Sequence, residues 1–123
     1  EGEMFFRPMV MNNLYNQVRS YMWIDTSVEN RKYGFKDACS RLVELDETVQ
    51  LPAGYKLANA DKNETMQGTG ADFEGSLAQQ GNKVLLHNKL ALKKRVYEAS
   101  DWESFRNAVN AHKAYGEYLV IKK

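Results

Sequence analysis

Alternating apolar and polar residues dominate the middle of the chain and predict long β-strands. Between Phe35 and Leu51 the even positions are mostly polar, with Leu42 the exception, and the apolar residues fall on odd positions. These apolar positions are Cys39, Val43, Leu45, Val49 and Leu51. A period of two over this length indicates a strand with one buried face. Pro52-Ala53-Gly54 then predicts a turn, after which another strand is expected to begin at Tyr55–Leu57.

A second alternating stretch predicts a β-hairpin. Its first strand has apolar or small residues at every other position, namely Ala71, Phe73, Gly75 and Leu77. Gly81-Asn82 is a two-residue hairpin signal. The return strand, expected from Val84 to Lys93, places Val84, Leu86, Leu90 and Leu92 on one face and His87, Lys89 and Lys93 on the other. Residues 59–70 are polar and contain glycine, so they are interpreted as a loop that is flexible at Gly68-Thr69-Gly70.

The period changes near the C-terminus, where one helix is expected over about residues 100–113. Ser100 followed by Glu103 fits a capping box. An apolar stripe follows at helical spacing, formed by Trp102, Phe105, Ala108, Val109 and His112. Gly116 closes the helical segment, and Tyr118–Ile121 predicts a final strand that is apolar on both faces and therefore lies inside a sheet.

The N-terminal third is the least regular part of the sequence. Met4–Arg7 is a short apolar stretch stopped by Pro8, which predicts an edge strand. Residues 9–34 fit either a helix or an ordered loop, and Tyr21–Ile24 is a further strand candidate. Together the elements predict a mainly β fold: a single antiparallel β-sandwich domain over residues 1–123, with about 7–8 strands, one helix and a final strand.

Composition narrows the class of protein. The chain has 123 residues, of which 43% are hydrophobic and 27% charged, and these values are typical of a globular domain. A net charge of +1 provides no basic footprint for nucleic acid. The basic triplet Lys93-Lys94-Arg95 is interpreted as the solvated edge of a strand. No apolar run is long enough for a transmembrane helix, and no signal-peptide pattern occurs. The chain begins at Glu1 rather than Met, and we expect it to be the C-terminal piece of a longer protein.

Candidate catalytic and metal-binding residues are few. Cys39, the single cysteine, lies on the apolar parity of its strand and is interpreted as a buried hydrophobe rather than a nucleophile. His87 lies on a polar strand face, and His112 lies near the helix end, where a charged imidazole would favour the dipole. The spacing of these residues supports no Cys–His pair. Acidic residues such as Asp61, Asp72 and Glu74 are scattered, so no metal site, cofactor or enzymatic activity is expected.

Aromatic residues in the N-terminal third provide one binding hypothesis. Tyr15, Tyr21, Trp23 and Tyr33 lie within this short region. Exposed aromatic side chains could stack on sugar rings or on a peptide, and Tyr21, Trp23 and Tyr33 are the candidate ligand-binding residues. The alternative is that they pack in the core or in an ordered loop, as aromatic side chains commonly do.

The second half of the chain resembles a known family. Leu51-Pro52-Ala53-Gly54-Tyr55-Lys56 resembles the turn of domains that follow a transglutaminase-like core in cell-envelope proteins of Gram-negative gut bacteria. Four further segments recur in the same order: Gly81–Val84, Leu90–Lys94, Tyr97–Arg106 and Leu119–Lys123. Met4–Pro8 is similar to the start of such domains. The resemblance is weak over residues 9–34, where this sequence departs most from the family.

The resemblance implies a β-sandwich, an extracytoplasmic location and no established activity for the domain itself. The catalytic cysteine of such proteins would belong to an upstream module, and Ala38-Cys39-Ser40 does not resemble that nucleophile. The resemblance therefore implies a non-catalytic accessory domain whose partner is the catalytic module of its own polypeptide. A carbohydrate- or peptide-binding module acting through the N-terminal aromatics is the alternative, and the sequence identifies no particular ligand.

Overall fold

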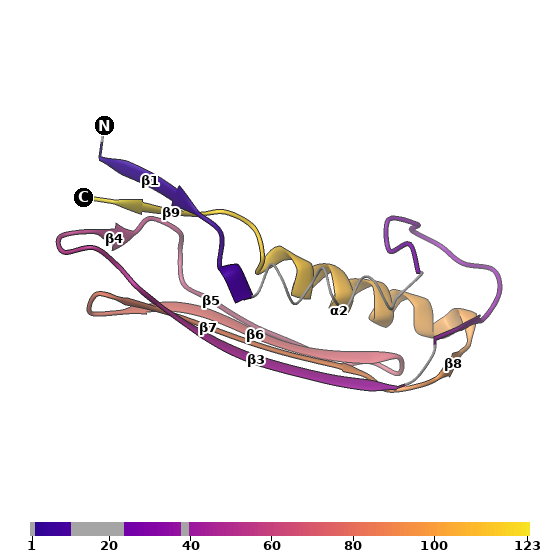
Figure 1. Ribbon diagram of the computed structural model, residues 1–123. Coiled ribbons are helices and arrows are strands. Elements are labelled where there is room, and N and C mark those ends of the chain that lie inside the picture. Colours follow the sequence, from indigo (N-terminus) through magenta and orange to yellow (C-terminus); the bar gives the residue numbers. More distant parts are fainter. Residues whose placement is uncertain (1, 11–23, 38–39) are drawn as a thin grey trace.

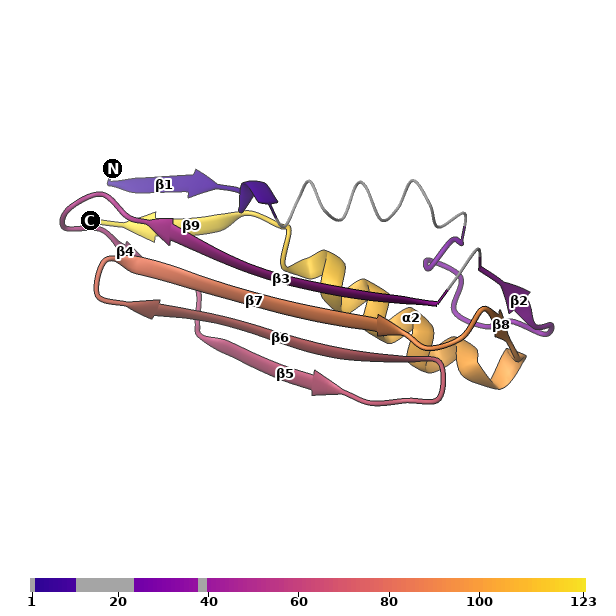
Figure 2. The same ribbon diagram turned by 60° about the horizontal axis from the view of Figure 1, so that its bottom comes forward.

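The computed structural model describes residues 2–10, 24–37 and 40–123, and within them nine strands form three antiparallel sheets (Figure 1). The largest sheet, called here the long sheet, has the order β3–β7–β6–β5. Its strands are β3 (Arg41–Gln50), β5 (Lys62–Met66), β6 (Ala71–Gln80) and β7 (Lys83–Leu92). Figure 2 shows β3 along one edge of this sheet and β5 along the other.

Two smaller sheets lie toward the ends of the long sheet (Figure 2). One has the order β1–β9–β4 and consists of β1 (Glu3–Phe6), β4 (Lys56–Leu57) and β9 (Leu119–Lys122). The other pairs β2 (Phe35–Lys36) with β8 (Val96–Tyr97). The predicted edge strand at Met4–Arg7 is confirmed as β1, and the apolar final strand is confirmed as β9, which lies between two neighbours. The two ends of the described chain meet here, since Lys123 N–H donates to Gly2 O at 3.0 Å.

One helix covers a face of the long sheet. A 3-10 turn, η1 (Ala99–Asp101), leads into α2 (Trp102–Ala114), which packs on β6 and β7 (Figure 1). The predicted apolar stripe is confirmed, because the residues that α2 buries are Trp102, Phe105, Ala108, Val109 and His112. A mainly antiparallel β fold with one C-terminal helix and a final strand is therefore confirmed.

The core lies between α2 and the inner face of the long sheet. The buried apolar residues of the two central strands are those of the predicted parity: Ala71, Phe73, Leu77, Val84, Leu86, Leu90 and Leu92. Beside β8 an aromatic cluster closes one end of this core. Phe35 stacks on Tyr97 with ring centroids 4.6 Å apart, and both rings meet the edge of Phe105. Aromatic pairs in such offset and edge-on arrangements stabilise a core beyond the area they bury.

The strand predicted from Phe35 to Leu51 is present in two parts. Its long part, β3, alternates along its whole length between half-buried odd positions and exposed even positions, as predicted. Its first residues form β2, which pairs with β8 in a different sheet. Cys39 lies between these parts and outside the described residues, as do residues 11–23, on which most of the helix-or-loop prediction and the Tyr21–Ile24 strand prediction fall.

Two local predictions are wrong. The segment 59–70, interpreted as a loop, contains strand β5, whose residues pair with β6 from Lys62↔Leu77 to Met66↔Phe73. Its residues are polar except for the half-buried Met66, so the pairing with β6, rather than an alternating hydrophobic pattern, holds it in place. The predicted N-cap is also displaced. The N-cap of α2 is Asp101 rather than Ser100. The preceding turn η1 is capped by Glu98, whose N–H donates to the Asp101 carboxylate at 2.9 Å, so the chain enters α2 through η1.

Candidate functional site: the outer face of the long sheet

The face of the long sheet opposite α2, called here the outer face, carries several charged side chains. Strand register arranges them in rows across the sheet, with Glu44, Lys89 and Glu74 in one row and Asp46, His87 and Ser76 in the next. Side chains directly opposite in an antiparallel pair lie close enough to interact. The outer face therefore presents alternating negative and positive groups rather than a single-sign field.

His87 lies between two carboxylates on this face. Its Nδ1 is 2.7 Å from Asp46 Oδ1, and its Nε2 is 3.9 Å from Glu74 Oε2. The predicted position of His87 on a polar strand face is thus confirmed. Within the part of the chain that the structure describes, no group of three or more His, Cys, Asp or Glu side chains is arranged to hold a metal ion.

Lys93 and Asp72 form an ion pair at the end of the same face. Lys93 Nζ lies 2.9 Å from Asp72 Oδ1 and also donates to Gly68 O at 3.0 Å. The hydrogen bond from Lys93 lowers the pKa of the Asp72 carboxyl, and the N–H of Gly68 adds to this effect. The basic triplet is solvated as predicted, since Lys93 and Arg95 are exposed, but it follows the central strand β7 rather than an edge strand.

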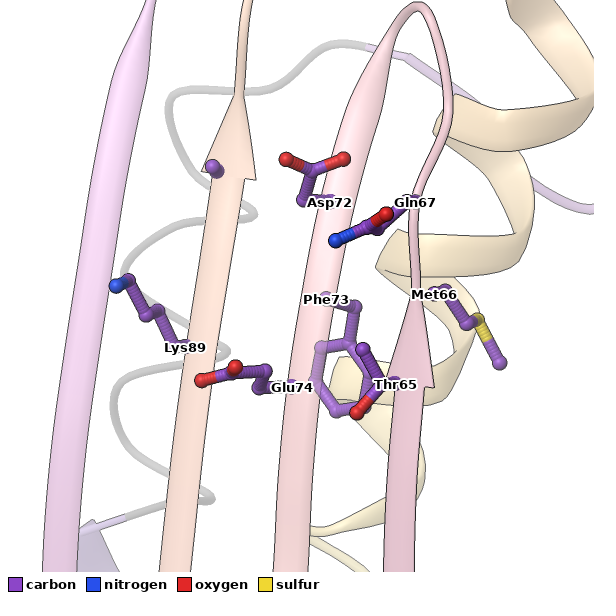
Figure 3. Close-up of a pocket in the computed structure, with 8 residues that line it drawn as sticks. Thr65, Met66, Gln67, Asp72, Phe73, Glu74 and Lys89 are labelled. Atoms are coloured by element: carbon purple, nitrogen blue, oxygen red, sulfur yellow. The ribbon is translucent and has the colours of Figure 1, made fainter.

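A shallow depression of about 230 Å³ lies on the outer face where β5, β6 and β7 meet the 67–70 loop. Its lining residues are Thr65, Met66, Gln67, Asp72, Phe73, Glu74, Lys89 and Ala91. Figure 3 shows the polar ends of Asp72, Glu74 and Lys89 on the open side of the sheet. Ligand sites for small molecules are usually larger and mostly apolar, with volumes of roughly 300–1,000 Å³. This depression can hydrogen-bond to a polar segment. In the described chain, no hydrogen bond joins the Thr65 hydroxyl to the carboxylate of its cross-strand neighbour Glu74.

A second depression lies beside the start of α2, and two of the hydroxyl groups that line it form hydrogen bonds within the fold. Thr69 Oγ1 donates to Asp101 Oδ1 at 2.6 Å. Ser104 Oγ accepts the Gly70 N–H at 3.0 Å and donates to Asp101 O at 3.1 Å. Far from being flexible, the 68–70 loop is fixed to the helix start by these bonds.

Asp101 is the centre of this junction, and the sequence signalled it only as an acid near a helix start. The residue is 2% exposed, and Lys94 Nζ lies 3.0 and 3.1 Å from its two carboxylate oxygens. The hydrogen bond from Thr69, together with those from Glu98 and Lys94, lowers the pKa of the Asp101 carboxyl. The group is therefore a structural anion that joins three chain segments.

His112 is buried rather than placed to interact with the helix dipole as a cation. Its Nδ1 lies 3.0 Å from Asn88 Oδ1, between α2 and β7. Burial lowers the pKa of His112 to about 4, so the imidazole is neutral near pH 7 and the dipole interpretation is wrong. His87 projects from the other face of the sheet, so the two histidines cannot act together. Cys39, their hypothetical partner, lies outside the described residues.

Of the three candidate ligand-binding residues, the structure places Tyr33 alone. Its side chain is 81% exposed, and it does not line the depression on the outer face. The segment around it is fixed to α2, since Trp102 Nε1 donates to Val28 O at 3.0 Å and the Arg31 guanidinium lies 4.4 Å from the Trp102 ring centroid. Tyr21 and Trp23 lie outside the described residues.

No helix among the described residues is long and apolar enough to cross a membrane. A search of curated proteins finds no match to the chain. Among solved structures, the chain is similar to that of a "putative protease" from Parabacteroides distasonis, with a TM-score of 0.70 and 11% sequence identity. The match covers 100% of this chain and 24% of the other, so the chain spans about a quarter of that protein, and at this identity the likeness shows the fold alone. A family model described as a domain of unknown function with a solved structure, DUF3858, matches residues 2–120, and the chain therefore belongs to the DUF3858 family.

Proposed function

We propose that the chain is a non-catalytic accessory domain of a longer cell-envelope protein, where it supports a transglutaminase-like or peptidase-like module on the same polypeptide. The observation that carries this proposal is the match to DUF3858 together with the solved relative, in which the same fold is 24% of a chain described as a putative protease. The transglutaminase-like module and the extracytoplasmic location rest on the sequence resemblance.

The chemistry of the described residues supports a structural role. His112 is neutral and buried, and the Asp101 carboxylate accepts hydrogen bonds from three groups. His87 has carboxylates on both sides, and in the described chain no hydrogen bond joins its ring to the hydroxyl of Ser76, its cross-strand neighbour on β6. General acid–base or nucleophilic catalysis needs such groups in mutual hydrogen-bond reach beside a cavity.

The end of the fold around β1 has exposed apolar side chains suitable for contact with another module. Phe5 is 66% exposed although it lies on a strand, and its cross-strand partner is Val120. Tyr118 is also exposed, and the Arg7 guanidinium lies 4.3 Å from its ring centroid. Aromatic and arginine side chains are enriched in protein interfaces, so we assign the contact with the catalytic module to this end of the domain.

Deletion and point substitution in the full-length parent protein test the proposal. Removal of residues 1–123, or the Phe5→Glu substitution, should lower the activity or the melting temperature of the catalytic module. Val96→Glu is the matched control, because Val96 is equally exposed but lies on β8. A parent protein that keeps full activity, stability and partner binding without residues 1–123 would contradict the accessory role.

A second candidate function is the binding of carbohydrate or peptide by the N-terminal aromatics. The exposed ring of Tyr33, on a segment fixed to α2, favours it. We expect such a module to bind on a glycan array, and Tyr33→Ala to weaken that binding while Tyr118→Ala does not. An array without signal for the folded chain would count against this function.

A further inference from the structure

No strand of the described residues pairs with the outer edge of β3, called here its free edge, and this edge differs from the other sheet edges. β3 is ten residues long, whereas the opposite edge strand β5 has five residues, and β1 and β4 have four and two. Proteins usually shorten, bend or cover edge strands, or place proline and lysine on them, because an exposed edge pairs with other chains. The β3 segment RLVELDETVQ contains neither proline nor lysine, and its register with β7 runs without a bulge from Arg41↔Leu92 to Gln50↔Lys83.

Two hydrogen bonds establish which backbone groups of β3 face outward. Leu51 N–H donates to Asn82 O at 2.7 Å, and Lys93 N–H donates to Gly70 O at 3.0 Å. In an antiparallel ladder the hydrogen-bonded pairs alternate, so even residues of β7 bond to β3 and odd residues bond to β6. The odd residues of β3 therefore bond to β7. The even residues, whose N–H and C=O groups turn away from the sheet, are Leu42, Glu44, Asp46, Thr48 and Gln50.

The side chains along this edge are suited to one more strand. On the inner face Val43, Leu45 and Val49 are only half-buried, as is Glu47 between the last two. The β7 residues opposite these four positions are all buried, namely Leu90, Asn88, Val84 and Leu86. A further strand with apolar residues on that face would cover the remaining apolar surface. On the outer face Glu44 and Asp46 are exposed at even positions, directly beside the outward backbone groups.

The charges on β3 select the kind of strand. The strand carries one arginine against three acidic residues. A second copy of β3 would pair poorly, because the two centred antiparallel registers place Asp46 opposite Asp46 or Glu44 opposite Asp46. Like charges directly opposite each other destabilise a cross-strand pair. A strand with Lys or Arg at alternate positions would instead place cations opposite Glu44 and Asp46.

We propose that β3 is a strand-addition site that binds an extended polypeptide segment of alternating basic and apolar residues as a fifth strand of the long sheet. Backbone hydrogen bonds to the even residues of β3 supply the affinity, and the cations opposite Glu44 and Asp46 supply the selectivity, as in other peptide recognition by β-augmentation. This site rests on the geometry of β3 alone and does not require a catalytic module in the parent protein.

The probe is a short capped peptide of alternating valine and lysine, compared with the matched valine–glutamate peptide. Titration of the chain followed by NMR should show the lysine peptide binding about tenfold or more tightly, with a preference that falls as salt is added. The double substitution Glu44→Lys and Asp46→Lys should reverse the preference. Equal affinity for the two peptides, no binding at millimolar peptide, or self-association of the chain through β3 would overturn the proposal.

Amide hydrogen exchange distinguishes strand addition from simple attraction of a cation to the outer face. In the free chain the N–H groups of even β3 residues should exchange quickly and those of odd residues slowly, and bound peptide should protect the even ones. Thr48→Pro removes an outward N–H but no bond to β7, so it should abolish peptide binding while Thr48→Ala does not. If Thr48→Pro unfolds the chain, protection of the even β3 amides by bound peptide in the original chain serves as the test of strand addition. Peptide binding that leaves the even amides unprotected would refute a fifth strand.

Discussion

His112 Nδ1 and Asn88 Oδ1 lie 3.0 Å apart in the core, where α2 crosses the inner face of β7. An amide oxygen accepts, so the imidazole carries its proton on Nδ1 and donates. Burial lowers the pKa of His112 to about 4, well below its usual value. The His112–Asn88 pair thus joins α2 to β7 in a region that is otherwise apolar. It requires a neutral imidazole, which becomes protonated in acid.

The pH dependence of stability follows from this pair. The folded pKa of His112 lies below the unfolded value near 6.5, so the unfolded chain binds more protons between pH 6.5 and about 4. The neutral, buried His112 therefore contributes to the free energy of unfolding. This contribution is fully present above about pH 6.5 and is lost as the pH falls to about 4, with a total on the order of 3 kcal/mol. Urea unfolding across this range should show the decline, and His112→Asn should flatten it.

His87→Gln provides the control, because His87 is on the outer face and outside the core. Its substitution should leave the decline between pH 6.5 and about 4 largely intact. If His112→Asn and the original chain lose stability in parallel over that range, His112 is not its source.

Asp101 should be the most sensitive charged position of the described chain. Asp101→Asn keeps the shape but removes the charge that Lys94 pairs with and weakens acceptance of the Thr69 and Glu98 hydrogen bonds. Loss of one member of a buried charged network costs about 2–4 kcal/mol of unfolding free energy. Chemical denaturation measures this loss directly.

Glu103→Gln is the matched control for Asp101→Asn, since it changes an exposed acid in the first turn of α2, two residues after Asp101, and should cost less than about 0.5 kcal/mol. The Lys94→Gln and Asp101→Asn substitutions should be clearly non-additive in a double-mutant cycle. Additive losses would show that the ion pair does not couple the two residues.

Gly68 is required by close packing rather than by backbone conformation. A Cβ at this position would lie 2.2 Å from Ser104 Cβ, whereas at Gly81 a Cβ meets nothing within 4 Å although φ is +61°. Overpacking costs about 1–3 kcal/mol, so Gly68→Ala should lower the free energy of unfolding more than Gly81→Ala. The alanine at position 81 meets no neighbouring atom and is disfavoured only by the positive φ angle. The added change Ser104→Gly should recover part of the loss in Gly68→Ala, and a double variant no more stable than the single one would argue against this contact.

The sequence predicted those elements that bury one face. β3, β6 and β7 each place alternate side chains against the core, so their period of two was visible, and the helix stripe from Trp102 to His112 was visible for the same reason. That stripe already placed His112 among apolar residues, so its burial could have been inferred. Strand β5 could not have been predicted from the sequence, because its side chains show no such alternation and it is held by backbone pairing with β6.

The polar networks escaped prediction because their members are far apart in the chain. Asp101 and Thr69 are separated by 32 residues, and His87 and Asp46 by 41. No local spacing signals such contacts, which depend on the strand register and on the packing of the helix start. The same holds for the free edge of β3, since strand order, rather than strand sequence, determines which strand lies at an edge.

Tyr115 should remain protonated at a pH that ionises ordinary tyrosines. Burial at the end of α2 raises the pKa of Tyr115 to about 12, and the nearby Glu64 carboxylate, 3.4 Å from the hydroxyl, adds to the shift. At pH 11 an exposed tyrosine is largely ionised, while Tyr115 should still be neutral in the folded chain. NMR of chains with 13C-labelled tyrosine should show this, with Tyr115→Phe assigning the signal.

Glu64→Gln should lower the pKa of Tyr115 only in part, because burial is the larger cause, whereas Glu74→Gln on the outer face should not change it. A Tyr115 signal that titrates together with exposed Tyr33 would show that the ring is not buried between α2 and β5.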